Sequence, residues 1–553
     1  MVLLSCGSST GNSSPSPAPG AAAADLVLVG GRLMTLVPES PEASALAIAD
    51  GRITAVGSDA EVERYIGPRT RVIRLEGRSV TPGLVDGHAH LYGLGASLES
   101  VSVRGATSEA EAADRIAEAA ASRPRGEWIT ARGWDQNLWD PPEFPHRESL
   151  DKRVPNHPVV LRRIDGHAAW VSSSALAIAG ITRSTKDPEG GRILRDSSGE
   201  ATGVLVDNAI ALVEAHIPAP SADVVKRRIL RAAALAASEG LTCVHDMGIG
   251  DATAAIYREL ARANRLPVRV YAFLAADSEV LTSLRSRNIE VDDGTAFFSM
   301  RGLKYYADGA LGSRGATLLT PYSDEPKNSG IWVHSREEIE DAAMRAAESG
   351  WQLATHAIGD AANRAVLDAY EKALARFPDR DHRFRIEHAQ VVSPQDLPRF
   401  AELGVIASMQ PTHATSDMGW AEDRLGPERI RGAYAWRTLL DTGARLVAGS
   451  DFPVEAVSPL LGIYAAVTRQ DTDGRPAGGW YPEQRLTLEE AVRAFSSEPA
   501  YAAFAEDSRG RLAKGYVADL TVLNRALQPG PDLLETHADM TIVGGRVVFE
   551  RER

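Results

Sequence analysis

The sequence predicts an α/β protein built on a (β/α)8 TIM-type barrel, with a β-sandwich from both termini and a large insertion. Eight short apolar runs alternate with helical segments through the middle of the chain, which is typical of a parallel barrel. Strand-like runs at both ends favour a separate sandwich. The interval after the first barrel strand is far longer than one helix requires. At 553 residues the chain also exceeds the usual size of a single core.

The first 24 residues are predicted to lie outside the fold. Leu3-Leu4-Ser5-Cys6 resembles the lipobox of bacterial lipoproteins, and residues 7–24 are rich in Ser, Gly, Pro and Ala, as in a flexible tether. Only five residues precede Cys6, whereas a signal peptide carries a basic n-region and an apolar h-region. We expect export and a membrane tether through a lipidated Cys6. A cytoplasmic location is the alternative.

The composite β-sandwich is expected from residues 25–80 together with 510–553. Gly30-Gly31 and Gly544-Gly545 each separate two apolar runs, and Asp50-Gly51 lies at the centre of a third such pair. Each of the three is a hairpin signal. Because strands from both ends join one sandwich, residues 81–509 are left as the barrel domain.

The barrel strands are predicted from short apolar runs bounded by turn residues. The first is Ser79–Leu84, directly before the segment that contains His88 and His90. The other candidates are Leu241–His245, Pro267–Leu274, Gly302–Ala307, Gln352–His356, Phe384–His388, Val405–Met409 and Arg445–Ala448.

Three of the intervening helices carry clear end signals. Ser335 with Glu338 forms a capping box, and that helix should stop at Gly350. Ser393-Pro394 predicts an N-cap with proline at the first helical position, in a helix closed by Gly404. Thr487 with Glu490 caps a helix after the last strand.

The segment from Tyr92 to Glu239 separates the first two barrel strands. It contains a predicted helix, Glu109–Ala121, and hairpin-like pieces around Gly190-Gly191 and Ser198-Gly199. We interpret it as a lid or substrate-selecting subdomain over the barrel mouth.

Six polar side chains fall at the carboxyl ends of the predicted strands, where barrel enzymes place their catalytic groups. His88 and His90 point to one face because side chains alternate along a strand. A lone His-x-His is as often structural as metal-binding. The later strands add Lys304, His356, His388 and Asp451 in strand order. Each has a structural alternative, but six coincidences in order favour a metal site.

The order of these residues resembles the amidohydrolase superfamily, in its YtcJ-like branch, which includes N-substituted formamide deformylase. The runs that match are Thr81 to His90, Lys304 to Arg314, Gly449 to Pro453, Arg132 to Trp139 and Asp165 to Trp170. The similarity covers nearly everything after Ala24. It implies the same fold, a barrel plus a sandwich made by both termini.

The resemblance implies a divalent metal site with one or two ions. In the two-ion form, His88, His90 and Asp451 hold one ion, His356 and His388 hold the other, and a carbamate on Lys304 bridges them. Imidazole and carboxylate ligands suit zinc, with manganese or iron as alternatives. Asp451 is then the catalytic proton shuttle for a metal-activated water that cleaves a C–N bond of a small amide-like molecule.

Five further residues are candidate substrate contacts. Trp134 and His167 come from the insertion and could form a lid wall, and Asp308 and Arg314 follow Lys304 at the mouth. The alternative for Arg314 is a structural ion pair, and tryptophans such as Trp134 more often pack than recognise ligands. His413 follows the seventh strand and could meet the scissile group.

Two kinds of alternative function stay open at this stage. The same metal site could hydrolyse a lactone, an ester or a phosphotriester, and the fold could serve a non-catalytic binding lipoprotein. A formal net charge of −14 argues against nucleic acid as a partner. A homodimer is expected by analogy with the superfamily.

Overall fold

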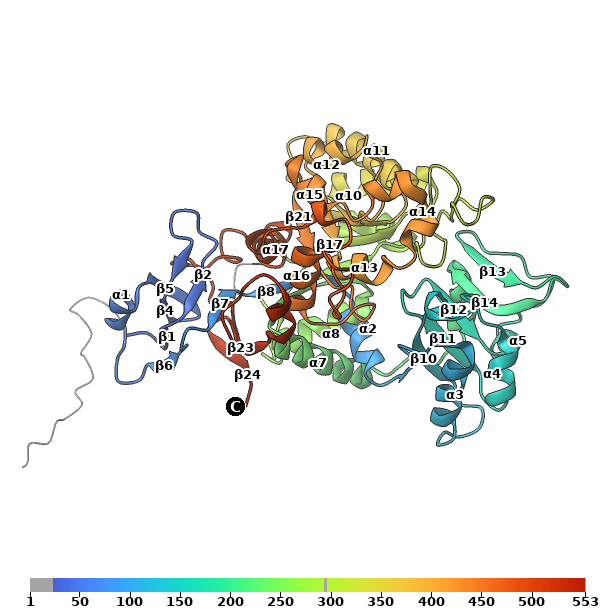
Figure 1. Ribbon diagram of the computed structural model, residues 1–553, viewed down its shortest axis with the longest axis horizontal. Helices are drawn as coiled ribbons and strands as arrows, with labels where there is room; N and C mark the ends of the chain where they lie inside the picture. The colour runs from blue at the N-terminus through green and yellow to red at the C-terminus, as the bar shows by residue number, and fades with distance from the viewer. Residues whose placement is uncertain (1–22, 293–295, 553) are drawn as a thin grey trace, which may run out of the picture.

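The computed structural model describes residues 23–292 and 296–552 of the chain. Cys6 lies outside the described residues, so its lipidation stays a prediction, as does a homodimer. Within the described ranges, no helix combines the length and the apolar character that crossing a membrane requires. Figure 1 shows three parts in a row, with the barrel between the sandwich strands at one end and the insertion at the other.

The predicted barrel is confirmed. Its eight strands pair in parallel in sequence order, from the first to the last. The circle nearly closes because Gly87 allows close contact, since a Cβ there would lie 2.3 Å from the Val447 side chain. The strands are β8 (Leu84–Ala89), β15 (Leu241–Ile249), β16 (Arg269–Ala275), β17 (Phe298–Tyr306), β18 (Gln352–Ala357), β19 (Arg385–His388), β20 (Ile406–Met409) and β21 (Leu446–Ala448).

Amphipathic helices surround the strands and bury alanine-rich faces against them. The capping boxes at Ser335 and Thr487 are confirmed, as is the left-handed stop at Gly350. The helices of the barrel domain are α2 (Leu91–Ser97), α7 (Ala222–Ser238), α8 (Asp251–Arg262), α9 (Ser278–Ser283), α10 (Arg336–Ser349), α11 (Asp360–Arg376), α12 (Leu397–Leu403), α13 (Pro411–Asp417), α14 (Ala421–Arg429), α15 (Trp436–Asp441), α16 (Pro459–Thr468), α17 (Leu488–Ala494) and α18 (Ser497–Ala502).

The predicted start of α12 at Ser393 is wrong. The Ser393 side chain bonds Gln395 within a turn, and the helix begins at Leu397 after Asp396. Its predicted end is correct, because Gly404 takes the left-handed conformation there. A serine followed by proline is therefore satisfied locally here instead of capping the helix.

The sandwich strands form two sheets that share one apolar core. Both chain ends contribute, since the C-terminal strand β22 pairs with β7. One sheet has the order β5-β4-β1-β6, with β5 (Arg52–Gly57), β4 (Ala45–Ala49), β1 (Leu26–Val29) and β6 (Arg71–Arg74), and α1 (Asp59–Glu63) beside it. The other has the order β24-β23-β22-β7-β2-β3, with β24 (Arg546–Glu550), β23 (Ala538–Val543), β22 (Leu520–Leu523), β7 (Ser79–Pro82), β2 (Arg32–Met34) and β3 (Glu42–Ala43).

Two of the three predicted sandwich hairpins are confirmed, at Asp50-Gly51 between β4 and β5 and at Gly544-Gly545 between β23 and β24. The hairpin predicted at Gly30-Gly31 is wrong, because β1 and β2 lie in different sheets. The run Ser79–Leu84 likewise divides between the two domains. It is sandwich strand β7 up to Pro82, and barrel strand β8 begins at Leu84.

The insertion has its own six-stranded mixed sheet with a buried apolar core on each face. Helix α7 lies inside the predicted insertion range but packs on α2 and β15, and so belongs to the barrel wall. The sheet order is β13-β14-β12-β11-β10-β9, with β13 (Gly191–Arg195), β14 (Ala201–Asp207), β12 (Ala168–Val171), β11 (Val159–Arg163), β10 (Ile129–Trp134) and β9 (Val101–Ser102). Its helices are α3 (Glu109–Ala120), α4 (Arg147–Arg153), α5 (Ser173–Ile178) and α6 (Ala211–Glu214).

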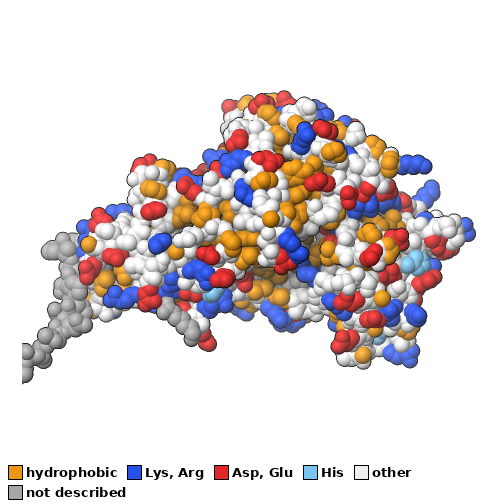
Figure 2. All heavy atoms as spheres, in the orientation of Figure 1, with side chains coloured by type: hydrophobic (Ala, Val, Ile, Leu, Met, Phe, Trp, Pro, Cys, Tyr) orange, Lys and Arg blue, Asp and Glu red, His pale blue; other side chains and the backbone are white. Residues whose placement is uncertain are grey.

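Charged side chains of both signs are interspersed over the face seen in Figure 2.

Candidate metal centre and its cavity

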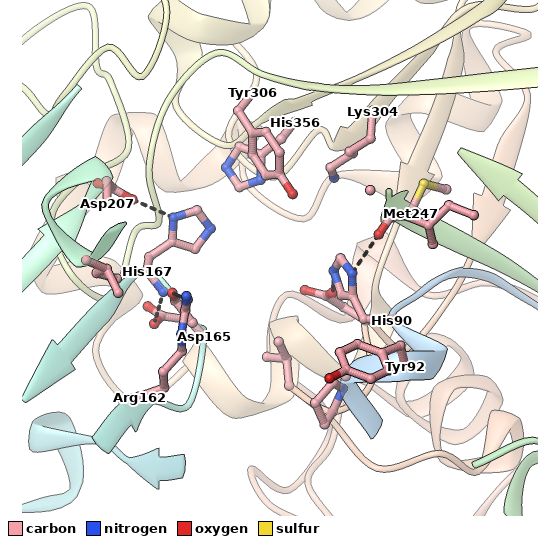
Figure 3. A pocket seen from close by; sticks show the side chains of 18 of the residues that line it. His90, Tyr92, Arg162, Asp165, His167, Asp207, Met247, Lys304, Tyr306 and His356 are labelled. Atoms are coloured by element: carbon pink, nitrogen blue, oxygen red, sulfur yellow. Dashed lines mark hydrogen bonds and ion pairs between the residues drawn. The ribbon is translucent and has the colours of Figure 1, made fainter. Parts of the chain in front are cut away.

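The six predicted ligands come from the carboxyl ends of barrel strands, as expected. His88 lies near the end of β8, and His90 follows that strand at the start of α2. Lys304 and His356 lie near the ends of β17 and β18, and His388 ends β19. Asp451 follows β21 with a φ of 58°, a conformation that few non-glycine residues adopt. Figure 3 shows Lys304, His356 and His90 around one hollow.

Asp451 lies at the centre of this group. One ligand atom each from His88, His388 and Asp451 lies within 4.8 Å of the other two, and all three side chains are buried. Oδ1 of Asp451 is 3.2 Å from Nε2 of His90 and 3.6 Å from Nε2 of His88. The structure therefore brings together two histidines and a carboxylate, with His90 beside them.

Three of the histidines around Asp451 have a hydrogen-bond partner on Nδ1, the ring nitrogen that faces away from it. Nδ1 of His88 is 2.5 Å from Oε2 of Glu387, and Nδ1 of His388 is 2.7 Å from Oε1 of Gln410. Nδ1 of His90 lies 3.0 Å from the carbonyl oxygen of Met247. A histidine fixed in this way presents Nε2 to a metal, and such partners orient the ring and set its tautomer.

The donor set fits a divalent cation. Nε2 of His88 and Oδ1 of Asp451 are buried without a hydrogen-bond partner, which is costly unless a ligand satisfies them. Burial, with the charge of Lys304, lowers the pKa of His88 to about 4, so its imidazole is neutral at pH 7. Burial would raise the pKa of Asp451, but the neighbouring histidines hold it well below its usual range. Neutral imidazoles around a carboxylate are the forms that bind metals.

Lys304 is buried beside this group, with its Nζ 5.0 Å from the centre of the Tyr306 ring. Burial lowers the pKa of Lys304 to about 8. A fraction of the side chain is then the free amine at neutral pH, the form that reacts with carbon dioxide.

His356 makes a different set of contacts. Its ring centre is 4.6 Å from that of His388. Its Nε2 lies 3.4 Å from the carbonyl oxygen of Gly309 and 3.7 Å from Oδ1 of Asp308. The structure thus groups His388 with His88 and Asp451, and leaves His356 at the side of that trio.

Two of the candidate substrate contacts reach the centre. His167 comes from the insertion, and its ring centre lies 4.9 Å from that of His356. Its Nδ1 is 2.7 Å from Oδ1 of Asp207. Figure 3 draws this hydrogen bond as a dashed line. Nε2 of His413 is 3.9 Å from Oδ2 of Asp451.

The other three candidates lie away from the cavities. Trp134 is fully buried in the core of the insertion, and its indole N–H donates to the carbonyl of Leu161. Arg314 pairs with Asp324, so its contacts match the structural alternative. Asp308 is fully buried and accepts backbone hydrogen bonds, so it shapes the loops that surround the site.

Two buried groups behind the ligands were not anticipated from the sequence. Glu387 bonds His88 and forms a fully buried ion pair with Arg385 on the same strand. Burial would raise the pKa of Glu387, but Arg385 and His88 keep it ionised. The available signal was its place next to His388, two residues after a charged Arg385 in an apolar strand. Gln410 follows the seventh strand and carried no such signal.

Two cavities meet at the centre. The main cavity, of about 590 Å³, opens between the barrel mouth and the insertion. A second cavity, of about 270 Å³, has several apolar lining residues. Both are lined by Asp165, His167, His356, His388 and Asp451. A molecule bound at the centre can therefore extend in two directions.

A family model described as "Amidohydrolase family" matches residues 71–549. The chain belongs to the amidohydrolase family. The putative amidohydrolase YtcJ of Bacillus subtilis is 35% identical over 536 residues, which are 94% of this chain and 99% of that protein. The YtcJ-like assignment made from the sequence motifs is thereby confirmed.

Two further similarities are to proteins described as hydrolytic enzymes. N-substituted formamide deformylase of Arthrobacter pascens is 29% identical over 520 residues, which are 91% of this chain and 93% of that protein. A crystal structure of an uncharacterized metal-dependent hydrolase from Pyrococcus furiosus matches with a TM-score of 0.70 and 31% identity. It covers 90% of this chain and 99% of its own. The chain is thus an amidohydrolase whose fold and centre suit metal-dependent hydrolysis.

Proposed function

We propose that this amidohydrolase cleaves a C–N bond in a small amide-like molecule with the help of a divalent metal. The observation that carries the proposal is the trio of His88, His388 and Asp451 at the junction of two cavities, with unsatisfied ligand atoms on His88 and Asp451. The chemistry supplied by a bound divalent ion is Lewis acidity, which polarises a carbonyl group and lowers the pKa of water toward about 7.

Asp451 is the proton shuttle in this proposal. The histidines keep its carboxylate ionised, so that it can accept a proton from the attacking water. The same carboxyl then delivers the proton to the leaving nitrogen, so that the amine departs neutral. His167 faces the centre from the insertion, and its Nδ1 is bonded to Asp207. Burial would lower the pKa of His167, but Asp207 raises it above its usual value, so the ring is favoured in the protonated form that presents an Nε2–H donor to the substrate.

The nitrogen and oxygen donor set favours zinc, with manganese or iron as alternatives. His88, His388 and Asp451 form one site, with His90 as a fourth donor. A second ion would use His356 and a carbamate on Lys304. In that step the free Nζ attacks the carbon of carbon dioxide and loses one proton, which leaves an anionic oxygen ligand.

An amide-like substrate is favoured over an ester or a phosphotriester by the relative that is named a formamide deformylase. A binding protein without catalysis is disfavoured because none of the six candidate ligands is missing from the chain.

The decisive experiment removes the metal. The purified protein is treated with a chelator, dialysed, and reloaded with zinc, manganese or iron, and hydrolysis of N-formyl, N-acyl, cyclic amide and ester substrates is measured at each stage. We expect activity on an amide to vanish with the metal and to return on reloading. Full activity in protein shown by elemental analysis to hold no metal would refute the proposal.

A further inference from the structure

Two arginines of the insertion stand side by side at the main cavity. Arg132 on β10 and Arg162 on β11 are direct neighbours across the two strands, and both line this cavity. Like charges at such a position repel each other and weaken the sheet unless each charge is compensated. The two arginines differ in whether a carboxylate compensates their charge.

Arg162 is compensated and Arg132 is not. The guanidinium of Arg162 binds both carboxylate oxygens of Glu214, with Nε 2.7 Å from Oε1. Arg132 donates from Nη2 to the carbonyl oxygen of Ile164 at 2.6 Å, and its Nε is buried without a partner. Among the described residues, no carboxylate lies within ion-pair distance of Arg132.

An unpaired guanidinium at a cavity wall costs stability, because a largely desolvated charge has lost its hydration. Burial, together with the charge of Arg162, lowers the pKa of Arg132 only to about 10, so it remains a cation at neutral pH. Gly166 lies against the guanidinium, since a Cβ there would be 3.5 Å from Nη2. Because residue 166 has no side chain, nothing at that position covers the guanidinium of Arg132. A fold that tolerates such a charge is expected to gain from it through a ligand.

We propose that Arg132 binds a carboxylate of the substrate, so that the natural substrates are amides with an anionic end, of the N-acyl amino acid class. This inference rests on the proposed function, which supplies the amide bond. The carboxylate occupies the main cavity, and the scissile bond lies at the junction near Asp451.

A single carboxylate matches this site better than a phosphate. One guanidinium can hold one carboxylate through two parallel hydrogen bonds. The guanidinium next to it, that of Arg162, is engaged by Glu214 and is therefore not available for the second charge of a phosphate dianion. The second cavity has room for an apolar group, because Leu138, Leu311, Ile358 and Trp420 are among the residues that line it.

The test measures binding and hydrolysis separately on the metal-loaded full chain. A panel of N-acyl amino acids, with N-acyl phenylalanines first, is compared with the matching carboxamides, which have the same shape without the charge. Binding is followed by titration calorimetry for the wild type, Arg132→Met, Arg132→Lys and the control Arg123→Met. Arg123 is an arginine of the same insertion that pairs with Glu127 and does not line the cavity.

We expect the wild type to bind the carboxylates at least about tenfold more tightly than the carboxamides. Arg132→Met should erase that difference, Arg132→Lys should keep part of it, and Arg123→Met should keep all of it. Because Arg132 is unpaired, Arg132→Met should not lower the melting temperature, whereas Arg162→Met should.

The possible failures are distinguishable. Equal binding of acids and carboxamides, or binding of acids that Arg132→Met leaves unchanged, overturns the proposal, as does a panel without any Arg132-dependent ligand. Arg132-dependent binding without hydrolysis of any amide would overturn the proposed function and leave the anion site in place. Hydrolysis of neutral amides at a rate that Arg132→Met leaves unchanged would support the proposed function and overturn the anion site.

Discussion

At the scale of single residues, the orientation of the candidate metal ligands is set by the groups that bond their Nδ1 atoms. Glu387 and Gln410 hold the Nδ1 atoms of His88 and His388, so both rings must present Nε2 toward Asp451. The imidazoles are neutral because burial lowers their pKa values. A metal therefore meets ligands that are already deprotonated and oriented, which reduces the cost of binding.

The first residue prediction concerns Asp451. Asp451→Asn keeps the shape of the side chain and an oxygen ligand, but the amide cannot accept a proton from water. We expect kcat to fall by about 100- to 10,000-fold, the usual contribution of a general base. Metal content, measured by elemental analysis, should remain near that of the wild type. A kcat within a few-fold of the wild type would remove Asp451 from the shuttle role.

A second residue prediction tests the partner of His388. Gln410→Leu removes the acceptor 2.7 Å from Nδ1 while keeping a side chain of similar volume. Metal affinity, measured by competition with a chelator, should fall by about 10- to 100-fold. Gln395→Leu is the control, since Gln395 bonds only the nearby Ser393 among the contacts described. An unchanged affinity in Gln410→Leu would mean that His388 is oriented by packing alone.

At the scale of elements, the loops that follow β17 and β18 are joined by one carboxylate. Asp308 accepts hydrogen bonds from the backbone N–H groups of Thr317, Ile358 and Gly359, at 2.7 to 3.0 Å. Burial raises the pKa of Asp308 to about 7 in spite of these bonds. The residue thus acts on the site through the loops it connects.

Replacing this connection should loosen both loops. Asp308→Ala leaves three buried N–H groups without an acceptor, and each such group costs about 1–3 kcal/mol. We expect the free energy of unfolding to fall by at least about 2 kcal/mol, measured with urea. Asp341→Ala, which breaks an exposed pair with Arg345 on α10, should cost less. Equal losses in the two variants would show that the buried bonds of Asp308 carry no special weight.

The same scale shows what the sequence could and could not predict. The barrel strands and capped helices were recognisable because apolar runs, Ser335, Thr487 and Gly350 act locally. The hairpin expected at Gly30-Gly31 failed because a Gly-Gly turn does not specify whether its two strands stay in one sheet.

The candidate site divides in a similar way. Strand order alone placed the six candidate ligands at one rim. The burial of Trp134 results from long-range packing inside the insertion. The sequence of β10 does not indicate which of its side chains face that core and which face the cavity. Gln410 was missed for the same reason, since its role comes from the position of His388 on another strand.

At the scale of the whole molecule, the sandwich and the insertion meet opposite ends of the barrel (Figure 1). The insertion contributes His167 and the two arginines to the cavity. The sandwich is fixed to the barrel through Arg269 of β16, whose guanidinium binds both carboxylate oxygens of Asp519 just before β22. Asp519 also accepts a hydrogen bond from the N–H of Gly544 in the last hairpin. This buried pair joins the two domains.

The pair predicts how stability depends on pH. Burial would raise the pKa of Asp519, but Arg269 lowers it below its usual value. An acid whose pKa is lower in the folded state stabilises the fold above its unfolded pKa, near 4, and loses that contribution as pH falls.

Asp519→Asn leaves Arg269 without this partner, so it should lower the free energy of unfolding by about 3 kcal/mol or more at pH 7. Urea titrations should show this difference shrinking below about pH 5, whereas Glu550→Gln, which breaks an exposed pair with Arg71, should change stability by under about 1 kcal/mol throughout. A difference between wild type and Asp519→Asn that stays constant down to pH 3.5 would mean that Asp519 does not hold the sandwich through its charge.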